Sequence, residues 1–519
     1  MASNHEPVEI TTTRRERATL LVAVLIISVC ALTYELVVAT LSSYLLGDSV
    51  TQFSFTIGFF LFAMGLGSLL SRRIKRHTLR YFIMVELAIA LFGGLSALIL
   101  YATFSRLDLY YYPVMISVSL AIGICVGLEI PLLTRIVADR AELSEALSDV
   151  LSIDYLGALI GSLAFPIILL PLLGVTQTAF LMGLCNIIVA VMVLWVFRHK
   201  LVPKWSTRLW FAGGGITIIM LAGSLASTDI TRVLEQSLYS ANVIYSQQTP
   251  YQRIVMTVRG EDYRLFINGN LQFSTLDEYR YHETLVHPVM MASRSRERVL
   301  VLGGGDGFAV REVLEYEDVQ EVVVVDLDPA ITELGRGHLI LARLNENALD
   351  SPLVTIRNED AFSYIQDGTD LFNVIIIDLP DPNSESLSKL YSDSFYRMLE
   401  NRLTPDGAFV TQSTSPYFAR RSFWTIHNTI EAAGFDTLPL HVYVPTFGEW
   451  GFIIGTPRTM PDITLSPDID YRYLTDEGLD ASRFFDPDIA DDPVAFDAVN
   501  TLDNPILPQF YEADWRRWS

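Results

Sequence analysis

Long apolar runs fill the first half of the chain, whereas the second half alternates short apolar and polar stretches. A helix needs about 20 consecutive apolar residues to cross a bilayer, and most of the runs before residue 226 reach that length. We therefore predict a transmembrane helical domain over residues 1–226. Its apolar segments lie near residues 18–46, 52–70, 81–104, 112–134, 150–173, 175–197 and 209–226.

Basic residues are concentrated in alternate connections between these segments. Arg14, Arg15 and Arg17 precede the first segment, "SRRIKRHTLR" follows the second, and "RHKLVPKWSTR" follows the sixth. Cytoplasmic loops of membrane proteins carry an excess of Lys and Arg. The pattern predicts a multi-pass membrane protein with its N-terminus and its basic loops in the cytoplasm.

The segments leave two alternatives for the side of the membrane on which the second half lies. Seven full crossings from a cytoplasmic N-terminus would place that half outside the cell. If the last segment does not cross fully, the second half is cytoplasmic. Segment 209–226 is the shortest and contains three consecutive glycines, which favours the cytoplasmic alternative.

Two carboxylates, Glu35 and Glu129, lie within apolar segments. A carboxylate at membrane depth is costly and is a functional candidate by default. Transport by this half is one interpretation, and a membrane anchor or a platform for dimerisation is the one we favour. Close packing between helices explains the glycines of these segments equally well.

The pattern of apolar residues changes after residue 226. Residues 227–290 alternate apolar and polar residues around the hairpin signal "NGN", and they predict a linker and a small β-strand domain. Residues 291–460 alternate continuous apolar strands with helical segments, which is typical of a Rossmann-like, doubly wound α/β sheet of the class I methyltransferase type. The acidic tail 461–519 contains aromatic residues that we expect to pack on this domain, and we assign it no role.

Charge is also distributed unevenly. Residues 1–226 hold 15 Lys/Arg and 13 Asp/Glu, whereas the remainder holds 22 and 46. A strongly acidic domain argues against nucleic acid as a partner, and it suits a cationic substrate or simply solubility. All three cysteines lie in the apolar runs, so we expect neither a disulfide framework nor a zinc site in the second half.

Acidic residues follow the predicted strands of the α/β sheet. Ligands of such sheets bind at the carboxyl ends of the strands. One acid there is commonly a helix cap or a turn former, but several acids on one edge repel each other unless a cation or hydroxyl groups lie among them. The acids at this edge are Asp306, Asp326, Asp328, Asp360, Asp378 and Asp381.

The loop "LGGGDG" after the first of these strands predicts a nucleoside site. Asp326 follows Asp306 by about 20 residues, which is the spacing of a ribose-binding acid. The spacing alone fits a dinucleotide as well as an S-adenosylmethionine-type ligand. Asp306 would repel a methionine carboxylate and attract an aminopropyl ammonium, so the loop favours decarboxylated S-adenosylmethionine.

Several motifs occur in a fixed order along the second half: "YQRI", "NGNLQFSTLDEYRYHE", "LVLGGGDG", "VVDLDP", "NEDAF", "IIIDLPDP" and "PDGAFVTQS". This order resembles that of the spermidine synthases, the polyamine aminopropyltransferases, over roughly residues 245–460. The whole chain is similar to the membrane-fused bacterial branch of that family. The resemblance implies a homodimer that transfers the aminopropyl group of decarboxylated S-adenosylmethionine to a di- or polyamine, with putrescine as the default acceptor, and releases methylthioadenosine. It implies no metal and no tightly bound cofactor.

The resemblance also implies roles for individual residues. Asp378 resembles the catalytic base, and Asp306 resembles the residue that holds the aminopropyl amine. The co-substrate site would further contain Gln252, His282, Gly303, Gly305, Asp326, Asp360 and Ala361, with Asp326 at the ribose and Asp360 at the adenine amino group. The amine pocket would contain Tyr281, Asp381, Gln412 and Phe447.

Two departures from the family pattern lie in the amine pocket. Leu379 and Pro380 stand where soluble members usually carry small hydroxyl residues, and Phe447 stands where tyrosine is usual, in a short late loop. They imply a reshaped acceptor site, so a different or longer amine is an alternative to putrescine.

Two other functions compete with aminopropyl transfer. One is an S-adenosylmethionine-dependent methyltransferase, against which Asp306 and the pair Asp378 and Asp381 argue. The other is a polyamine transporter or sensor whose second half only binds its ligand.

Overall fold

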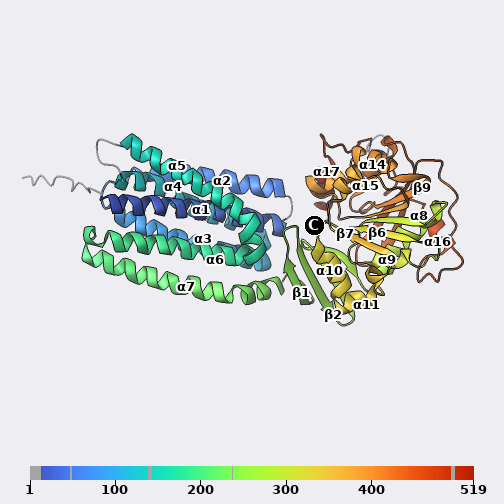
Figure 1. Ribbon diagram of the computed structural model, residues 1–519, viewed down its shortest axis with the longest axis horizontal. Helices are drawn as coiled ribbons and strands as arrows, with labels where there is room; N and C mark the ends of the chain where they lie inside the picture. The colour runs from blue at the N-terminus through green and yellow to red at the C-terminus, as the bar shows by residue number, and fades with distance from the viewer. Residues whose placement is uncertain (1–12, 47–48, 138–142, 237, 492–496, 519) are drawn as a thin grey trace, which may run out of the picture. The chain divides into compact units, whose positions relative to one another are not determined.

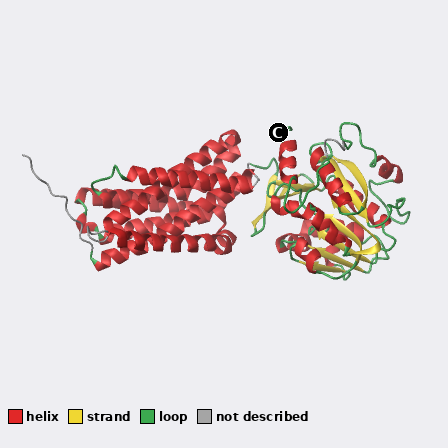
Figure 2. Ribbon diagram, turned by 90° about the horizontal axis from the view of Figure 1, so that it is seen from above, coloured by secondary structure: helices red, strands yellow, loops and turns green. Residues whose placement is uncertain are grey.

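The apolar segments of the first half form long helices in the computed structural model (Figure 1). The structure describes residues 13–46, 49–137, 143–236, 238–491 and 497–518. The chain folds as two compact units, Met1–Asn242 and Val243–Ser519. The first unit is helical, and the second combines helices with strands (Figure 2).

By length and composition, six helical stretches among the described residues could cross a membrane. The stretch Glu145–Val196 counts once in that number, although Gly174 interrupts it with a non-helical φ of 70°. That break falls between the predicted segments 150–173 and 175–197. The helices are α1 (Arg14–Leu46), α2 (Ser49–Ser71), α3 (Thr78–Leu107), α4 (Tyr111–Val137), α5 (Leu143–Ala164), α6 (Leu170–Val196) and α7 (Pro203–Gln236).

Helix α7 corrects the expectation for the last apolar segment. It is one helix of 34 residues, and at about 1.5 Å per residue it is long enough to cross a bilayer. The helix continues through polar residues on both sides of segment 209–226, so the apolar run understated its length. Shortness therefore no longer supports a partial crossing, and the cytoplasmic location of the second half stays a prediction.

Glycines bring α2 and α4 into backbone contact. A Cβ atom on Gly127 would lie 2.1 Å from the carbonyl oxygen of Met64, and a Cβ atom on Gly67 would lie 2.1 Å from that of Ile124. Small residues at such crossings allow close van der Waals packing between apolar helices. Packing is thus sufficient to explain these glycines.

The second unit begins with a four-stranded sheet of β1 (Asn242–Gln248), β2 (Arg253–Arg259), β3 (Asp262–Ile267) and β4 (Asn270–Ser274), in that order. Strands β3 and β4 are antiparallel. The "NGN" turn joins them, with φ of 49° at Asn268 and 83° at Gly269. Two successive positive φ values are typical of the type I′ turn that suits a hairpin.

A seven-stranded sheet forms the core of the second unit, in the order β10-β11-β9-β8-β5-β6-β7. The five strands from β9 to β7 are mutually parallel. At the other end β11 is antiparallel to β9, and β10 is antiparallel to β11. This is the expected Rossmann-like sheet. Its strands are β5 (Arg298–Gly303), β6 (Glu321–Val325), β7 (Val354–Arg357), β8 (Phe372–Asp378), β9 (Leu403–Gln412), β10 (Asp436–Val444) and β11 (Gly448–Thr456).

Alternate side chains of the central strands pack on opposite faces of the sheet. Val299 and Val301 share a core with α8 (Glu278–Ala292) and α9 (Phe308–Val313). Leu300 and Leu302 share one with α14 (Asp393–Glu400) and α15 (Arg420–Ala432). Helices on both faces bury the strands completely, which is why their sequences are continuously apolar. The other described helices of this unit are α10 (Pro329–Gly337), α11 (Leu339–Leu344), α12 (Ala361–Asp367), α13 (Glu385–Ser388), α14 (Asp393–Glu400), α15 (Arg420–Ala432), α16 (Asp476–Ala481) and α17 (Leu507–Trp515).

The order of the strands reverses at β5. The chain proceeds outward to β6 and β7 on one side and then returns to β8 and β9 on the other. Loops that leave the carboxyl ends of β5 and β8 in opposite directions open a crevice between them. This topological switch point is where the predicted acids converge.

Candidate active site

The loop after β5 passes directly over the end of β8. Gly303 is the register partner of Asp378 in the parallel pairing of these strands. A Cβ atom on Gly303 would lie 2.0 Å from the carbonyl oxygen of Asp378, and its φ is +81°. Only glycine fits, because both the contact and the left-handed conformation exclude a side chain.

Asp306 lies in this loop and is partly buried. The N–H of Phe308 donates a hydrogen bond of 3.0 Å to its Oδ1. Burial raises the pKa of Asp306 to about 6; the positive charge of nearby His282 opposes that shift, and the charge of Asp378 adds to it. The structure therefore brings Asp306, His282 and Asp378 into one electrostatic group.

Asp326, at the end of β6, faces the same loop. The N–H of Gly305 donates to its Oδ2 at 3.2 Å, and the N–H of Asp328 donates to its Oδ1 at 2.9 Å. A Cβ atom on Gly305 would lie 2.6 Å from Oδ2, so this glycine also permits a close approach. Burial raises the pKa of Asp326 to about 6 in spite of the two backbone donors.

Gln252 lies in the connection between β1 and β2, and hydrogen bonds tie this connection to the end of β6. The hydroxyl of Thr249 donates to Asp328 at 2.7 Å, and it accepts from the N–H of Gln252 at 3.0 Å. Asp328 in turn caps α10, accepting from the N–H of Ala330. The small β-sheet therefore supplies Gln252 to the same edge of the large sheet.

Asp360 caps α12, which begins at the partly exposed edge beyond β7. Its side chain accepts from the N–H of Ser363 at 3.0 Å, and Lys389 lies 2.9 Å from its other oxygen. Burial by itself would raise the pKa of Asp360, but the hydrogen bond and charge of Lys389 together with the hydrogen bonds from Ser363 outweigh it and hold the pKa below its usual range. Ala361, the first residue of α12, is buried.

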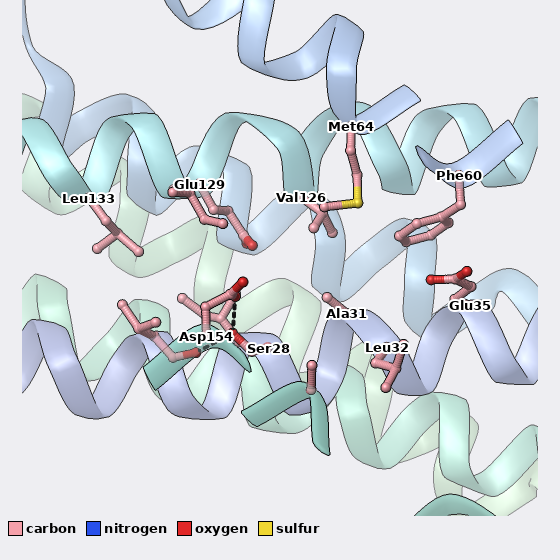
Figure 3. A pocket seen from close by; sticks show the side chains of 14 residues that line it. Ser28, Ala31, Leu32, Glu35, Phe60, Met64, Val126, Glu129, Leu133 and Asp154 are labelled. Carbon is pink, nitrogen blue, oxygen red and sulfur yellow. Dashed lines mark hydrogen bonds between the residues drawn. The ribbon is translucent and has the colours of Figure 1, made fainter. Parts of the chain in front are cut away.

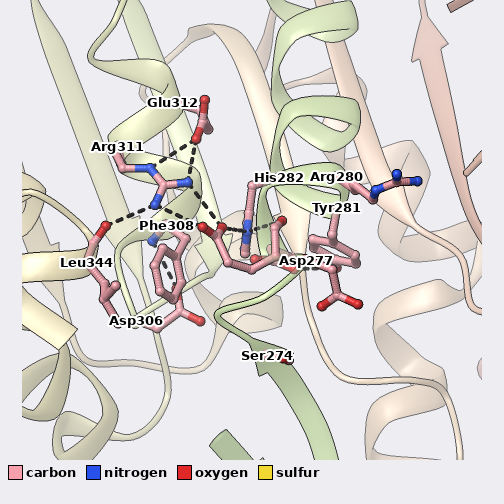
Figure 4. A network of polar contacts seen from close by, with 12 residues as sticks. Ser274, Asp277, Arg280, Tyr281, His282, Asp306, Phe308, Arg311, Glu312 and Leu344 are labelled. Atoms are coloured by element: carbon pink, nitrogen blue, oxygen red, sulfur yellow. Dashed lines mark hydrogen bonds and ion pairs between the residues drawn. The ribbon is translucent and has the colours of Figure 1, made fainter. Parts of the chain in front are cut away.

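A buried network holds His282 on α8 (Figure 4). Its Nδ1 lies 2.8 Å from Oε2 of Glu278, and Arg311 donates two hydrogen bonds to the same carboxylate, at 3.2 and 3.1 Å. Burial alone would lower the pKa of His282, but the hydrogen bond and charge of Glu278, together with the charges of Asp306 and Asp378, outweigh it and raise the pKa. The imidazole therefore favours its charged form beside the acids.

The same network continues away from the site. Arg311 also contacts Glu312 at 2.6 Å, and Glu312 lies 3.0 Å from Nε2 of His287. Because every member is paired, the network orients His282 without leaving a buried charge uncompensated. Sequence analysis missed these supporting residues, since no local pattern links α8 to α9.

Asp378 receives a hydrogen bond of 2.7 Å from the hydroxyl of Tyr281. Burial raises the pKa of Asp378, while His282 and the Tyr281 hydroxyl oppose that shift. The ring of Tyr281 lies 5.0 Å from that of Phe452 and 6.3 Å from that of Phe447. Aromatic packing thus fixes the hydroxyl that orients Asp378.

Asp381 lies on the loop after β8, three residues beyond Asp378. It accepts from Gln412 at 3.3 Å and from the hydroxyl of Tyr511 at 2.8 Å. Gln412 also donates to the hydroxyl of Tyr391 at 2.7 Å. Burial raises the pKa of Asp381 to about 6, and both hydrogen bonds oppose that shift.

Tyr511 belongs to α17, in the tail to which sequence analysis gave no role. Asp514 anchors this helix through Arg421 at 2.7 Å, and the ring of Trp515 stacks on that of Phe418 at 5.1 Å. The tail therefore packs on the rest of the second unit and brings the hydroxyl of Tyr511 to Asp381. Its aromatic residues indicated packing, but not which side chain would reach the site.

The fold and this site define a Rossmann-like enzyme domain of the class I methyltransferase type, with acids gathered at the switch point. Residues 278–467 match the family described as the spermine/spermidine synthase domain. A polyamine aminopropyltransferase of Leptospira interrogans is 45% identical over 501 residues, which are 96% of this chain and 99% of that protein. Polyamine aminopropyltransferase 2 of Ralstonia nicotianae is 44% identical over 516 residues, 96% and 99% of the two chains.

A polyamine aminopropyltransferase of Mycobacterium tuberculosis is 38% identical over 517 residues, which are 96% of this chain and 97% of that protein. The chain belongs to the polyamine aminopropyltransferase family, and it is an enzyme of that family. The predicted resemblance is confirmed, and the relatives match along both units. Among solved structures, spermidine synthase from Thermotoga maritima is 24% identical with a TM-score of 0.43, covering 47% of this chain and 85% of that one.

Replacing Asp306 by asparagine tests the cost of burying its carboxylate. The folded protein keeps this proton up to about pH 6, whereas an Asp in the unfolded chain loses it near pH ~4. The folded state thus binds more protons between these values, and wild-type stability falls relative to the variant as pH rises through the window. We expect Asp306→Asn to raise the free energy of unfolding by about 1–3 kcal/mol at neutral pH and to change it little near pH ~4.

Thermal unfolding of the ligand-free protein at the two pH values measures this difference. The exposed Asp468, replaced by asparagine, is the matched control and should show no such pH dependence. An equal effect of Asp306→Asn at both pH values would contradict the electrostatic explanation.

Proposed function

We propose that this chain transfers the aminopropyl group of decarboxylated S-adenosylmethionine to an aliphatic di- or polyamine, with putrescine as the default acceptor, and releases methylthioadenosine. The observation that carries the proposal is the group of three partly buried carboxylates, Asp306, Asp378 and Asp381, at the switch point. The tail of the nucleoside and the acceptor are both aliphatic ammonium ions. Each gains from an anionic partner in a site that excludes water.

The glycine loop and the end of β6 suit the nucleoside. Two backbone N–H groups orient the carboxylate of Asp326, and its remaining lone pairs can accept from ribose hydroxyls. Gly303 and Gly305 allow the loop to lie directly against Asp378 and Asp326, and Asp306 would pair with the terminal ammonium. A methionine carboxylate at that position would meet a like charge.

The remaining residues of the co-substrate site support this arrangement. We assign Asp360 and Ala361 to the adenine, and Gln252 to the opposite side of the nucleoside. His282 lowers the pKa of Asp306 relative to burial alone. It thereby keeps that carboxylate available as the anion that an ammonium needs.

Asp378 would act as the general base. The acceptor arrives as an ammonium ion and must lose one proton to become a nucleophile. Burial raises the pKa of Asp378, which makes its carboxylate a stronger base, and the Tyr281 hydroxyl fixes its orientation. The proton of the ammonium moves to Asp378 as the amine nitrogen becomes free to react.

The neutral amine then attacks the methylene carbon of the aminopropyl group that is bonded to sulfur. The new N–C bond forms as the C–S bond breaks, and the electron pair of that bond stays on sulfur. The sulfonium becomes a neutral thioether, methylthioadenosine, so the leaving group needs no acid. Holding both reactants in place by their ammonium groups supplies the proximity that the substitution requires.

The amine pocket would hold the far end of the acceptor. Asp381 supplies the charge, and Gln412 and Tyr511 orient its two oxygens. Tyr281 and Phe447, whose ring centroids are 6.3 Å apart, supply an apolar wall for the methylene chain. The pairing of Asp378 with Asp381 suits an acceptor that is charged at both ends.

Incubating the purified full-length protein with decarboxylated S-adenosylmethionine and a panel of amines tests the reaction. We expect methylthioadenosine with putrescine or a longer amine, and a loss in kcat of about 10²–10⁴-fold in Asp378→Asn, because general base catalysis is lost. Asp468→Asn, on the exposed surface, should match the wild type. Failure to form methylthioadenosine with any amine, or an unchanged rate in Asp378→Asn, would contradict the proposal.

Tyr511→Phe tests the contribution of the tail to the amine pocket. Its hydroxyl lowers the pKa of Asp381, so its loss raises that pKa and leaves less of the anion near pH ~6.5 than near pH ~8. We expect KM for the amine to rise several-fold, more at the lower pH, with KM for decarboxylated S-adenosylmethionine unchanged. Tyr443→Phe, at an exposed tyrosine, is the control, and equal effects on both KM values would count against the assignment.

We also infer that the helical unit resides in a lipid bilayer. Six described stretches are long and apolar enough to cross one, and the basic residues lie in alternate connections. Extraction of membranes at alkaline pH should leave the protein in the pellet, whereas detergent should release it. Recovery of the protein in the alkaline supernatant would show that the helices do not span the bilayer.

A further inference from the structure

Two of the acids that line the cavity of the helical unit are bound to other side chains of the protein. This cavity, of about 100 Å³, lies between α1, α2, α4 and α5 (Figure 3). Ser28 donates a hydrogen bond to Asp154, and Glu129 is hydrogen-bonded to the buried Glu86. These contacts account for Asp154 and Glu129 without a ligand.

Thr414, in the second unit, adopts a backbone conformation that threonine rarely takes. It lies two residues beyond the end of β9, and its φ is 59°. Among the described residues other than glycine that have a positive φ, it is the one with a branched Cβ, and the side chain of such a residue strongly disfavours this conformation. Conformations of this kind persist where the surrounding structure enforces them, often at functional sites.

Strand β11 holds Thr414 in place. The N–H of Gly451 donates a hydrogen bond of 2.8 Å to the carbonyl oxygen of Thr414, and the carbonyl oxygen of Gly451 accepts one of 2.8 Å from Ser413. A Cβ atom on Gly451 would lie 2.3 Å from the ring of Phe423, so glycine allows this close approach. Thr414 is fully buried, and its conformation is therefore fixed by the strand beside it.

The main chain of Thr414 decides which end of the Gln412 side chain faces Asp381. The N–H of Thr414 donates a hydrogen bond of 3.0 Å to Oε1 of Gln412. Because an N–H group can only donate, the oxygen of the amide must lie on this side and its NH₂ group on the other. Nε2 of Gln412 then donates to Asp381 at 3.3 Å and to the hydroxyl of Tyr391 at 2.7 Å. A reversed amide would turn its oxygen toward the carboxylate.

The main chain alone does not account for threonine at this position. Glycine would take the same φ without strain and would keep the same N–H. The side chain adds a hydroxyl beside Asp381. Burial raises the pKa of Asp381 to about 6, hydrogen bonds from Tyr511 and Gln412 oppose that rise, and the hydroxyl of Thr414 opposes it as well. The strained threonine thus supplies a donor to this acid that glycine would lack.

We propose that Thr414 is a positioning residue for the acceptor amine, which orients Gln412 through its main chain and stabilises the anionic form of Asp381 through its hydroxyl. The proposal rests on the assignment of Asp381 and Gln412 to the amine pocket under the proposed function. Thr414 acts through these two residues and does not need to touch the amine. Its role is to keep a fixed negative charge available for an ammonium ion.

Titration calorimetry of the full-length protein in detergent, with putrescine or spermidine and with methylthioadenosine present, measures amine binding without turnover. Thr414→Val removes the hydroxyl and keeps the shape, and Thr414→Gly removes it from a residue that takes a positive φ freely. We expect both variants to raise Kd for the amine about three- to tenfold. The increase should be larger near pH ~6.5 than near pH ~8, because Asp381 then keeps its proton to a higher pH.

Three controls separate this role from a structural one. Thr414→Ser keeps the hydroxyl and should bind the amine as the wild type does. Kd for methylthioadenosine should stay unchanged in every variant, and if Thr414→Val disturbs it, Thr414→Gly decides the outcome. Thr355→Val, at an exposed threonine on β7, should match the wild type. Wild-type amine binding in the valine and glycine variants, equal weakening at both pH values, or no recovery in Thr414→Ser would overturn the proposal.

The calorimetry and the assay of the reaction give separate results. Product formation by the wild type, together with unchanged amine binding in the Thr414 variants, would leave the reaction standing and refute the role of Thr414. The predicted pattern of amine binding without any product would support that role and refute the reaction. A wild-type protein that binds neither amine would refute both.

Discussion

The contact between the main chain of Gly303 and the carbonyl oxygen of Asp378 is the constraint on which the second unit depends. We call this unit, Val243–Ser519, the catalytic unit. The contact seats the loop after β5 on the end of β8, so acids that are remote in sequence share one edge of the sheet. Gly305 repeats the arrangement against Asp326. Both positions need glycine because a Cβ atom would overlap the neighbouring oxygen. The positions of the acids therefore depend on glycine, which has no side chain, at residues 303 and 305.

Gathering carboxylates at this edge has an electrostatic cost that the fold only partly relieves. Burial raises the pKa values of Asp306, Asp326 and Asp381 to about 6. The positive charge of His282 offsets part of this rise for Asp306. Functional sites commonly retain such destabilising arrangements. In the proposed reaction the unrelieved negative charge would become affinity when cationic substrates enter, so the cost of the ligand-free site and its specificity would have the same origin.

Sequence alone was sufficient for much of the catalytic unit because its signals are local. Continuous apolar strands, a glycine loop and an acid at each strand end predicted the parallel sheet and its switch point. Strand β10 was not predicted, since Asp436 and Pro439 interrupt its apolar pattern. The structure places this strand at the edge of the sheet, where a proline costs no ladder hydrogen bond.

The contacts that sequence analysis missed all join segments that are far apart in the chain. Tyr511 reaches Asp381 across 130 residues, and Lys389 pairs with Asp360 from the short 3-10 helix Lys389–Tyr391. The aromatic residues of the tail predict that it packs on the folded domain. Which surface it covers depends on tertiary structure, which no local pattern shows. The length of α7 was missed for a related reason, because a helix can continue through polar residues after its apolar run ends.

The central claim is that Asp306 selects a nucleoside whose tail carries an ammonium and no carboxylate. Calorimetric titration of the purified protein with decarboxylated S-adenosylmethionine and with S-adenosylmethionine tests it directly, since the two ligands differ only in that carboxylate. The account predicts at least about tenfold tighter binding of the decarboxylated form, a difference of about 1.4 kcal/mol. Equal affinities, or tighter binding of S-adenosylmethionine, would contradict it.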